Sequence, residues 1–157
     1  MTDVTKRKCI VSDIDGTLAL LDHRRHHVAS KPKNWKAFFA EIPKDKPNMA
    51  VVVALKAFHD QRHYPLILCS GRGKEHAAVT IAWIKQHIEE PFGIYFEALY
   101  MRELRDHRAD DIVKRELLNK MRLDGWDPQL VLDDRDRVVA MWRSEGIPCF
   151  QVAPGDF

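Results

Sequence analysis

Two aspartates separated by one residue are the feature of this sequence with the clearest chemical potential. They lie in the run Asp13-Ile14-Asp15-Gly16-Thr17-Leu18, which directly follows a short apolar segment. Two carboxylates this close repel one another, and a divalent cation would remove that repulsion. Oxygen ligands of this kind suit Mg²⁺. An EF-hand calcium loop is a poor alternative, because its glycine comes sixth whereas Gly16 comes fourth.

Three further polar groups could act on a phosphate. Ser70-Gly71-Arg72-Gly73 offers a hydroxyl, a flexible backbone and a guanidinium, which together suit a phosphate pocket. Lys114 lies in a charged helical segment, where a lone lysine is usually a solvated surface residue. Asp133 and Asp134 follow a short apolar run, and two acids at a buried strand end are costly unless they meet a cation or donors.

The elements that must position these groups alternate between strands and helices, which is typical of an α/β domain with a parallel sheet. The predicted strands are Lys8–Ser12, Leu66–Ser70, Ile94–Met101 (a strand or part of a hairpin), Leu130–Leu132 and Pro148–Val152. The predicted helices are Asn48–His63, Lys74–Glu90, Asp110–Arg122 and Arg137–Glu145. Ligands bind beyond the carboxyl ends of the strands in such a sheet. We therefore expect the acidic and hydroxyl groups to meet there.

The region between Leu18 and Asn48 does not follow the alternation. It is basic and rich in histidine at His23–His27, and it then offers one short helix, Trp35–Ile42, which we expect Pro43 to end. Long connections of this kind are often functional. We interpret it as an insertion of approximately residues 19–47 that forms a small cap over the end of the first strand.

The length and composition restrict the class of protein. The 157 residues fit one domain, and the 45% apolar fraction argues against disorder. The 25 Lys and Arg against 23 Asp and Glu exclude a polybasic protein that holds nucleic acid by bulk charge. The longest apolar run, Met49–Leu55, is far shorter than the ~20 residues of a transmembrane helix. No secretory signal is visible at Met1–Lys8, so we expect no membrane partner.

The three cysteines also indicate where the protein acts. Cys9, Cys69 and Cys149 cannot all pair within one chain, and each lies in an apolar stretch. We interpret them as buried reduced thiols that pack as small hydrophobic residues, and we expect a cytoplasmic location.

The order of the four polar elements resembles the motif order of the haloacid-dehalogenase superfamily of phosphohydrolases. A closer resemblance is to the 3′-phosphatase domain of phage-type polynucleotide kinase/phosphatase, and it implies a phage origin. It implies a parallel sheet of Rossmann type flanked by helices, with a small cap after the first strand. Five segments carry it: Ser70-Gly71-Arg72, Asp106–Lys114, Leu132-Asp133-Asp134-Arg135, Val138–Arg143 and Gln151–Phe157.

This resemblance implies roles for individual residues. Asp13 would be the nucleophile that forms an aspartyl-phosphate, Asp15 the general acid and base, and Lys114 a catalytic cation beside them. Mg²⁺ would be held by Asp13, the backbone carbonyl of Asp15, and Asp133 and Asp134, with the direct ligand among the last two left open. The residues that would bind or position the phosphate are Thr17, Ser70, Gly71, Arg72, Asp110 and an arginine of the cap, Arg24 by position, with Arg25 adjacent.

The resemblance implies a Mg²⁺-dependent phosphomonoesterase that removes 3′-phosphate from DNA or RNA ends in repair. A phosphatase of free nucleotides or another small phosphomonoester is the alternative, and a nonenzymatic module that binds nucleic-acid ends is a third reading. The chain lacks a G-x-x-x-x-G-K-[ST] loop, so we expect a single phosphatase domain over residues 1–157, no kinase domain, and a separate kinase or ligase as a partner in the pathway.

Two groups of residues could contact the polynucleotide itself. An arginine rim could bind its backbone, although we expect any single member to be a surface residue or a salt-bridge partner; its candidates are Arg102, Arg105, Arg108, Arg135 and Arg143. Trp35, Phe38 and Phe39 could stack on a terminal base, but we expect them to pack the cap helix onto the body. For the segment His23–His27, a solvated loop and a phosphate-binding role are both open.

Overall fold

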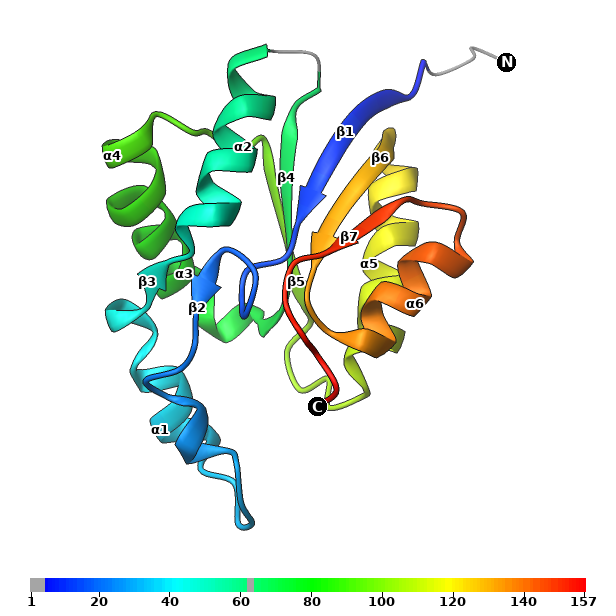
Figure 1. The fold of residues 1–157 in the computed structure, drawn as a ribbon. Helices are drawn as coiled ribbons and strands as arrows, with labels where there is room; N and C mark the ends of the chain where they lie inside the picture. Colours follow the sequence, from blue (N-terminus) through cyan, green and yellow to red (C-terminus); the bar gives the residue numbers. More distant parts are fainter. Residues whose placement is uncertain (1–4, 62–63) are drawn as a thin grey trace.

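One parallel sheet organises the chain. The computed structural model describes residues 5–61 and 64–157, so the predicted helix end at His63 lies outside them. The five strands follow the order β5-β4-β1-β6-β7, and every pairing is parallel (Figure 1). Their bounds are β1 Arg7–Ser12, β4 Leu66–Gly73, β5 Ala98–Arg102, β6 Trp126–Asp133 and β7 Cys149–Gln151.

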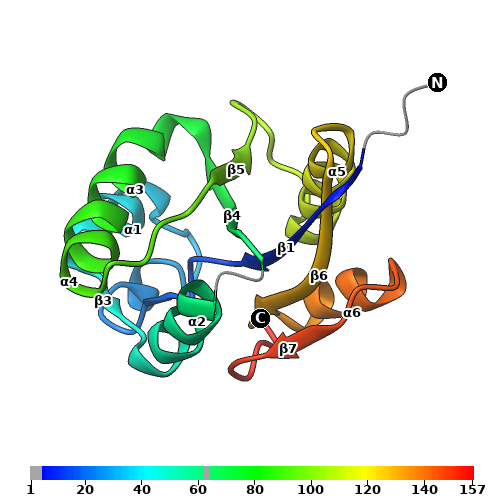
Figure 2. The ribbon, with the colours of Figure 1, turned by 90° about the horizontal axis from the view of Figure 1, so that it is seen from above.

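Helices cover both faces of the sheet. On one face lie α2 (Met49–Gln61) and the helical segment made of a 3₁₀ turn (Lys74–His76), α3 (Ala77–Ile84), a π-helical turn (Lys85–Glu89) and α4 (Glu90–Phe92). On the other face lie α5 (Asp110–Leu123) and α6 (Asp136–Ser144). Figure 2 looks onto the molecule from above and shows the two groups separated by the sheet. The predicted α/β architecture is therefore confirmed.

Two hydrophobic cores, one on each face, hold the layers together. The core under α5 and α6 contains the three cysteines, all of them unpaired and at most 5% exposed. Burial raises the pKa of Cys9 and of Cys149 to about 12, so these thiols stay protonated. This confirms the interpretation of the cysteines as buried reduced side chains. Within the described residues, no helix combines the length and the apolar character needed to cross a bilayer.

Three predicted elements need correction. The segment Ile94–Met101 is no hairpin, because its strand begins at Ala98 and pairs in parallel with β4 at the sheet edge. Strand β6 begins four residues before the predicted Leu130. A shift in its register with β1 lets it pass Pro128, which has no backbone N–H to donate. In the predicted helix Asp110–Arg122, the pattern favours Ile112 on the apolar face, but Ile112 is 45% exposed in the first turn of α5.

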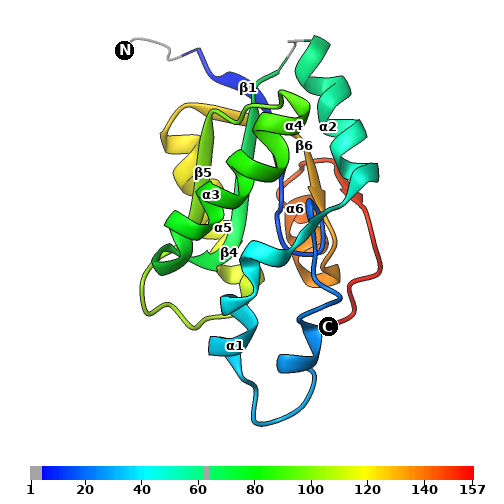
Figure 3. The ribbon, with the colours of Figure 1, turned by 90° about the vertical axis from the view of Figure 1, so that its left-hand side faces the viewer.

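The insertion after β1 lies beyond the carboxyl ends of the strands (Figure 1, Figure 3). Its stem is a short antiparallel pair, β2 (Ala19–Leu20) with β3 (Lys46–Pro47). Between them lie a 3₁₀ turn (Arg25–His27), α1 (Trp35–Ala40) and a second 3₁₀ turn (Ile42–Lys44). We call residues 19–47 the cap.

The predicted end of the cap helix at Pro43 is wrong. Helix α1 already ends at Ala40, and Pro43 lies in the first positions of the following 3₁₀ turn. Proline is tolerated there because the first N–H groups of a helix have no partner within the helix.

Candidate active site

A buried lysine joins the two principal acidic motifs. Lys114 Nζ lies 2.8 Å from Asp13 Oδ1 and 2.9 Å from Asp133 Oδ2. Asp13 follows β1, Asp133 ends β6, and Lys114 projects from the first turns of α5, so three elements meet at the carboxyl edge of the sheet. The exposed fraction of each of these residues is 4% or less. Lys114 is thus not the solvated surface residue that a lone helical lysine usually is, and it lies beside Asp13, where the family resemblance places it.

The charge states of this cluster follow from its burial. Burial alone would lower the pKa of Lys114, but Asp13 and Asp133 raise it well above its ordinary value, so the ammonium stays charged. Burial raises the pKa of Asp13 well above its ordinary value; Lys114 opposes this rise, and Asp133 and Asp134 add to it. Asp110 lies 3.7 Å from Lys114, so three carboxylates lie within 4.0 Å of this ammonium, and Asp134 lies beside Asp13 and Asp133. The cluster therefore has an excess of negative charge.

The two adjacent aspartates after β6 differ in their surroundings. Asp133 Oδ1 accepts from the backbone N–H of Asp134 at 2.9 Å, and Asp133 Oδ2 accepts from the Trp142 indole at 3.1 Å as well as from Lys114. Asp134 Oδ2 is buried and has no hydrogen-bond partner. Burial and the neighbouring Asp133 raise the pKa of Asp134 to about 6. An orphaned buried oxygen of this kind calls for a ligand.

The donor set fits a hard divalent cation. Asp13, Asp133 and Asp134 each offer a carboxylate oxygen, and these oxygens lie within 4.8 Å of one another. Glycine at position 16 allows Asp134 to approach the loop after β1. The backbone there has a φ of +79°, which favours glycine, and a Cβ would overlap the carboxylate of Asp134. The excess negative charge and the orphaned Asp134 oxygen both match Mg²⁺.

A second cluster holds Asp15 between two buried arginines. Arg72 donates to Asp15 through Nε at 3.0 Å and through Nη2 at 2.5 Å, and Arg24 Nη2 donates at 2.9 Å. Both guanidiniums are at most 1% exposed. Burial alone would raise the pKa of Asp15, but Arg72 and Arg24 together lower it. A phosphate group at this position would compete with Asp15 for the same guanidiniums.

Asp45 of the cap completes this cluster. It is not among the site residues predicted from the sequence. Its Oδ1 and Oδ2 each accept from Arg24 at 2.7 Å, and its Oδ2 also lies 3.3 Å from Arg72 Nη2. His23 Nε2 lies 2.7 Å from Oδ1. Arg24 is therefore the cap arginine that binds Asp15 and Asp45. Arg25 is partly buried: it lies 3.8 Å from Asp22, its guanidinium carbon lies 5.1 Å from the centroid of the Phe157 ring, and its charge opposes the rise in the pKa of Asp134.

The other predicted phosphate-binding residues line the same edge. Thr17 Oγ1 donates to Asp13 Oδ2 at 3.0 Å. Ser70 is fully buried, and its Oγ accepts from the backbone N–H of Arg72 at 3.1 Å. A Cβ at Gly71 would overlap the carboxylate of Asp110, so only glycine allows this approach. The structure thus brings together every predicted site residue, while their roles in the reaction stay predictions.

Four arginines of the predicted rim have partners within the protein, as expected for surface residues and salt-bridge partners, and a role of the rim in binding a polynucleotide stays a prediction. Arg102 donates to the Gly71 and Arg108 carbonyls, Arg108 pairs with Asp106 and Glu116, Arg135 donates to Phe157 O, and Arg143 donates to Cys149 O. Arg105, the fifth candidate, lies in the loop before α5, and its backbone is in the left-handed region with a φ of 60°.

Loss of the Asp45 carboxylate tests the second cluster. We expect Asp45→Ala to lower kcat by about 10²-fold, as for a misplaced catalytic group. We also expect it to reduce the free energy of unfolding by about 3 kcal/mol, because two buried guanidiniums would keep Asp15 as their one paired carboxylate. Phosphate release and thermal denaturation measure the two effects. Asp22→Ala, which removes the carboxylate 3.8 Å from Arg25, is the matched control. Equal behaviour of the two variants would remove Asp45 from the site.

A family model and several proteins of known description match the chain. The model of the polynucleotide kinase PNKP phosphatase domain matches residues 7–157. A protein of Autographa californica nuclear polyhedrosis virus, described as a bifunctional polynucleotide kinase/RNA ligase, is 26% identical over 141 residues, 90% of this chain and 18% of that protein. A chain of the Pnkp1/Rnl/Hen1 RNA repair complex is 34% identical, with a TM-score of 0.78, over 100% of this chain and 46% of that one.

More distant structures share the fold alone. A class C acid phosphatase from Bacillus anthracis with bound tungstate is 17% identical over 96% of this chain and 68% of that one, with a TM-score of 0.64. The chain spans less than half the length of the two relatives described above. The activities and partners of those whole proteins therefore belong to longer chains than this one.

Proposed function

Since the chain belongs to the family of polynucleotide kinase phosphatase domains, which are phosphatases of the haloacid-dehalogenase type, we propose that it removes the 3′-phosphate from polynucleotide ends with the help of Mg²⁺. The observation that carries this proposal is the pairing of two buried clusters at one sheet edge. One contains Asp13 with Lys114, and the other contains Asp15 with Arg24 and Arg72. In this proposal Asp13 would be the nucleophile, Asp15 the proton donor, and Lys114, Arg24 and Arg72 the cations that face the phosphate.

In the first step, a carboxylate oxygen of Asp13 forms a bond to phosphorus while the bond between phosphorus and the 3′ oxygen breaks. Asp15 gives its proton to that leaving oxygen. In the second step, Asp15 takes a proton from water, whose oxygen attacks phosphorus, and the bond to Asp13 breaks. Inorganic phosphate leaves and both aspartates return to their starting states.

The arginines explain how Asp15 could start this cycle protonated. In the structure Arg24 and Arg72 lower its pKa, which favours the carboxylate. Phosphate oxygens drawn to the same two guanidiniums would release Asp15 from them. Burial would then raise its pKa and favour the acid form that the first step needs. Substrate binding would in this way prepare its own proton donor.

Asp13, Asp134 and the backbone carbonyl of Asp15 would hold the Mg²⁺ directly. Asp133 is already oriented by Lys114, Trp142 and a backbone N–H, so we assign it to positioning. The bound cation would neutralise charge on the carboxylates and on the phosphoryl oxygens. Lys114 would supply a second positive charge beside Asp13.

A phosphatase of free nucleotides or of another small phosphomonoester is the second candidate. The same two clusters would serve it, so the substrate alone separates the candidates. A rate comparison of a 3′-phosphorylated oligonucleotide with 3′- and 5′-mononucleotides tests the choice. Faster turnover of both mononucleotides than of the oligonucleotide would overturn the polynucleotide assignment.

The relatives support a place in nucleic-acid repair. One is described as a polynucleotide kinase/RNA ligase, and another belongs to an RNA repair complex. We propose that a kinase and a ligase act on the same broken ends as this phosphatase. Removal of a 3′-phosphate leaves the 3′-hydroxyl that an end-joining reaction requires. DNA and RNA ends are both candidates, and oligonucleotides of each kind tested in parallel would separate them.

Metal removal has two measurable consequences. We expect EDTA to abolish phosphate release and excess Mg²⁺ to restore it. We also expect Mg²⁺ to raise the melting temperature, because it neutralises a buried acidic cluster. Asp134→Asn removes one of the repelling carboxylates. The variant in EDTA is expected to be about 1–3 kcal/mol more stable than the unchanged protein at neutral pH, because a raised aspartate pKa is a cost of ionisation.

The sign of this effect depends on pH. The folded-state pKa of Asp134 is about 6, above its ordinary value of 3.8, so its charge destabilises the fold as pH rises through that interval. The gain from Asp134→Asn is therefore expected at pH 7 and absent at pH 4. The variant is also expected to lose the melting-temperature increase on adding Mg²⁺. An Asp134→Asn protein with an unchanged response to Mg²⁺ would contradict the assignment of this ligand.

A further inference from the structure

Unpaired positive charge is concentrated on the cap. Residues 19–47 hold seven of the 25 basic residues and only three of the 23 acidic ones, so the cap is basic while the rest of the chain is net acidic. All three acids, Asp22, Glu41 and Asp45, lie within 4.0 Å of a histidine or an arginine. Within the described residues, no carboxylate lies within 4.0 Å of an ammonium group of the cap lysines, which are Lys31, Lys33, Lys36, Lys44 and Lys46.

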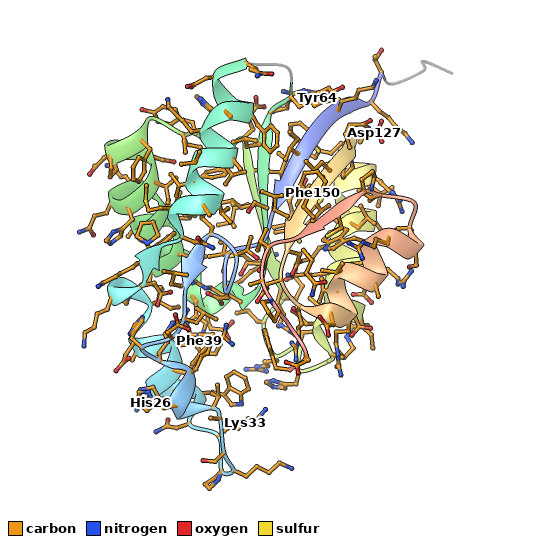
Figure 4. All side chains as sticks on the ribbon, in the orientation of Figure 1. His26, Lys33, Phe39, Tyr64, Asp127 and Phe150 are labelled. Carbon is orange, nitrogen blue, oxygen red and sulfur yellow. The ribbon has the colours of Figure 1, made fainter. Side chains whose placement is uncertain are left out.

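One aromatic side chain of the cap is left open to solvent. Trp35 is 49% exposed, whereas the other three tryptophans are at most 7% exposed. Phe38, on the same helix, is buried with its ring 4.2 Å from the Arg24 guanidinium carbon. Phe39 stacks on His76 of the body at 4.2 Å between ring centroids (Figure 4). The predicted packing of the cap helix onto the body is therefore correct for Phe39, whereas Phe38 is buried within the cap and Trp35 is half exposed.

Trp35 is connected to the phosphate site through consecutive contacts. Its ring lies 5.6 Å from the Phe38 ring, and Phe38 packs against Arg24, which donates to Asp15. The ring also lies 5.9 Å from Phe39, which fixes its orientation. The ammonium of Lys33 lies 5.5 Å from the centroid of the Trp35 ring. An aromatic face with the Lys33 ammonium beside it is thus connected to the phosphate site through Phe38, and Lys31 and Lys36 are its neighbours in the sequence.

We propose that Trp35 and the neighbouring lysines Lys31, Lys33 and Lys36 form a subsite for the single strand that precedes the 3′-phosphate. A base stacks on Trp35, and the lysines contact the backbone phosphates. This inference rests on the proposed function. The subsite would make the enzyme prefer a polynucleotide, which has a preceding base to stack on Trp35, to a mononucleotide, which has none. Base stacking on an aromatic ring tolerates any sequence, since every base has a π-face.

The expected effect of Trp35→Ala is selective for long substrates. Stacking of ~1–3 kcal/mol per base predicts a loss of about 10–100-fold in kcat/KM for a 3′-phosphorylated oligonucleotide. Hydrolysis of p-nitrophenyl phosphate, which has no preceding nucleotide, is expected to be unchanged. Tyr95→Ala is the matched control, because Tyr95 is a 59% exposed aromatic residue outside the cap, in the segment before β5.

The lysines are tested through the dependence on salt. Each removed phosphate contact is expected to reduce the slope of log kcat/KM against log salt by ~0.7 for a single strand. The double variant Lys33→Ala/Lys36→Ala is compared with Lys85→Ala/Lys120→Ala, which removes two exposed lysines from other helices. An equal slope for both pairs would overturn the role of the cap lysines.

A binding measurement tests the subsite without turnover. Trp35 is the exposed tryptophan, so stacking of a base is expected to quench its fluorescence. The Asp13→Asn protein is titrated with short oligothymidylate that carries a 3′-phosphate, and the quench is expected to disappear in Asp13→Asn/Trp35→Phe. An undiminished quench in the double variant would overturn the inference. So would an equal loss of activity on both substrates in Trp35→Ala, because that pattern marks a disturbed cap.

Failure of the inference and failure of the proposed function give different results. An unchanged protein that hydrolyses p-nitrophenyl phosphate but not the oligonucleotide contradicts the function. An unchanged protein that hydrolyses the oligonucleotide, together with a Trp35→Ala variant that does so equally fast, contradicts the subsite alone. In the first case the fluorescence titration still decides whether a strand binds at Trp35.

Discussion

Replacement of Asp13 by asparagine is expected to lower phosphate release by at least about 10³-fold, because the amide cannot replace the carboxylate as nucleophile. The fold is expected to persist. The variant keeps the side-chain shape, and removal of a buried carboxylate relieves repulsion with Asp133 and Asp134. Release of inorganic phosphate from a 3′-phosphorylated oligonucleotide measures the effect, and circular dichroism confirms the fold.

Asp127→Asn is the control for this experiment. Asp127 lies at the start of β6, away from the carboxyl edge of the sheet (Figure 4), and its replacement is expected to leave the rate unchanged. Trapping of radioactive phosphate on the unchanged protein but not on the Asp13→Asn variant would supply direct support for the covalent step. Retained turnover in Asp13→Asn would show that another group attacks phosphorus.

Replacement of Lys114 by methionine is expected to damage both activity and stability. Lys114 has three carboxylates within 4.0 Å of its ammonium, and it bonds to Asp13 and Asp133 at 2.8 and 2.9 Å. Without it, the free energy of unfolding in EDTA is expected to fall by about 3–5 kcal/mol, the usual cost of removing one partner of a buried ion pair. We expect kcat to fall by about 10³-fold, because the nucleophile loses its orientation and the phosphoryl group loses a cation.

Two comparisons make this result interpretable. Lys120→Met removes a lysine from the exposed end of the same helix and is expected to change neither quantity. Saturating Mg²⁺ is expected to recover part of the stability of Lys114→Met, since it supplies positive charge to the same carboxylates. A variant as stable as the unchanged protein in EDTA would contradict the buried ion-pair account.

The core of the site could be predicted from the sequence because strand ends mark it. Apolar runs followed by Asp13, by Ser70 and by Asp133 identify three neighbouring strands, and parallel strands bring their carboxyl ends to one edge. The role of Lys114 was open in the residues themselves. A charged helix conceals that one of its lysines points inward, and only the motif order singled it out.

The remaining parts of the site depend on contacts that no spacing encodes. Asp45 lies in a Lys-Asp-Lys-Pro stretch with no motif, and it reaches Arg24 only because β2 and β3 close the cap stem. The partners of the predicted arginine rim could not be identified from the sequence for a similar reason. Local carboxylates and carbonyls bind Arg102 and Arg108. The proposal that Asp134 rather than Asp133 holds the metal directly also depends on the structure, because the Trp142 indole donates to Asp133 while Oδ2 of Asp134 has no partner.

A substrate panel tests the central claim most directly. The protein is incubated with Mg²⁺ and with DNA and RNA oligonucleotides phosphorylated at the 3′ end, the same oligonucleotides phosphorylated at the 5′ end, and 3′-mononucleotides. We predict that kcat/KM is highest for a 3′-phosphorylated oligonucleotide and at least about 10-fold lower for the 3′-mononucleotide, from the loss of stacking. A kcat/KM equal to or higher for 5′-phosphorylated ends or for mononucleotides would contradict the account.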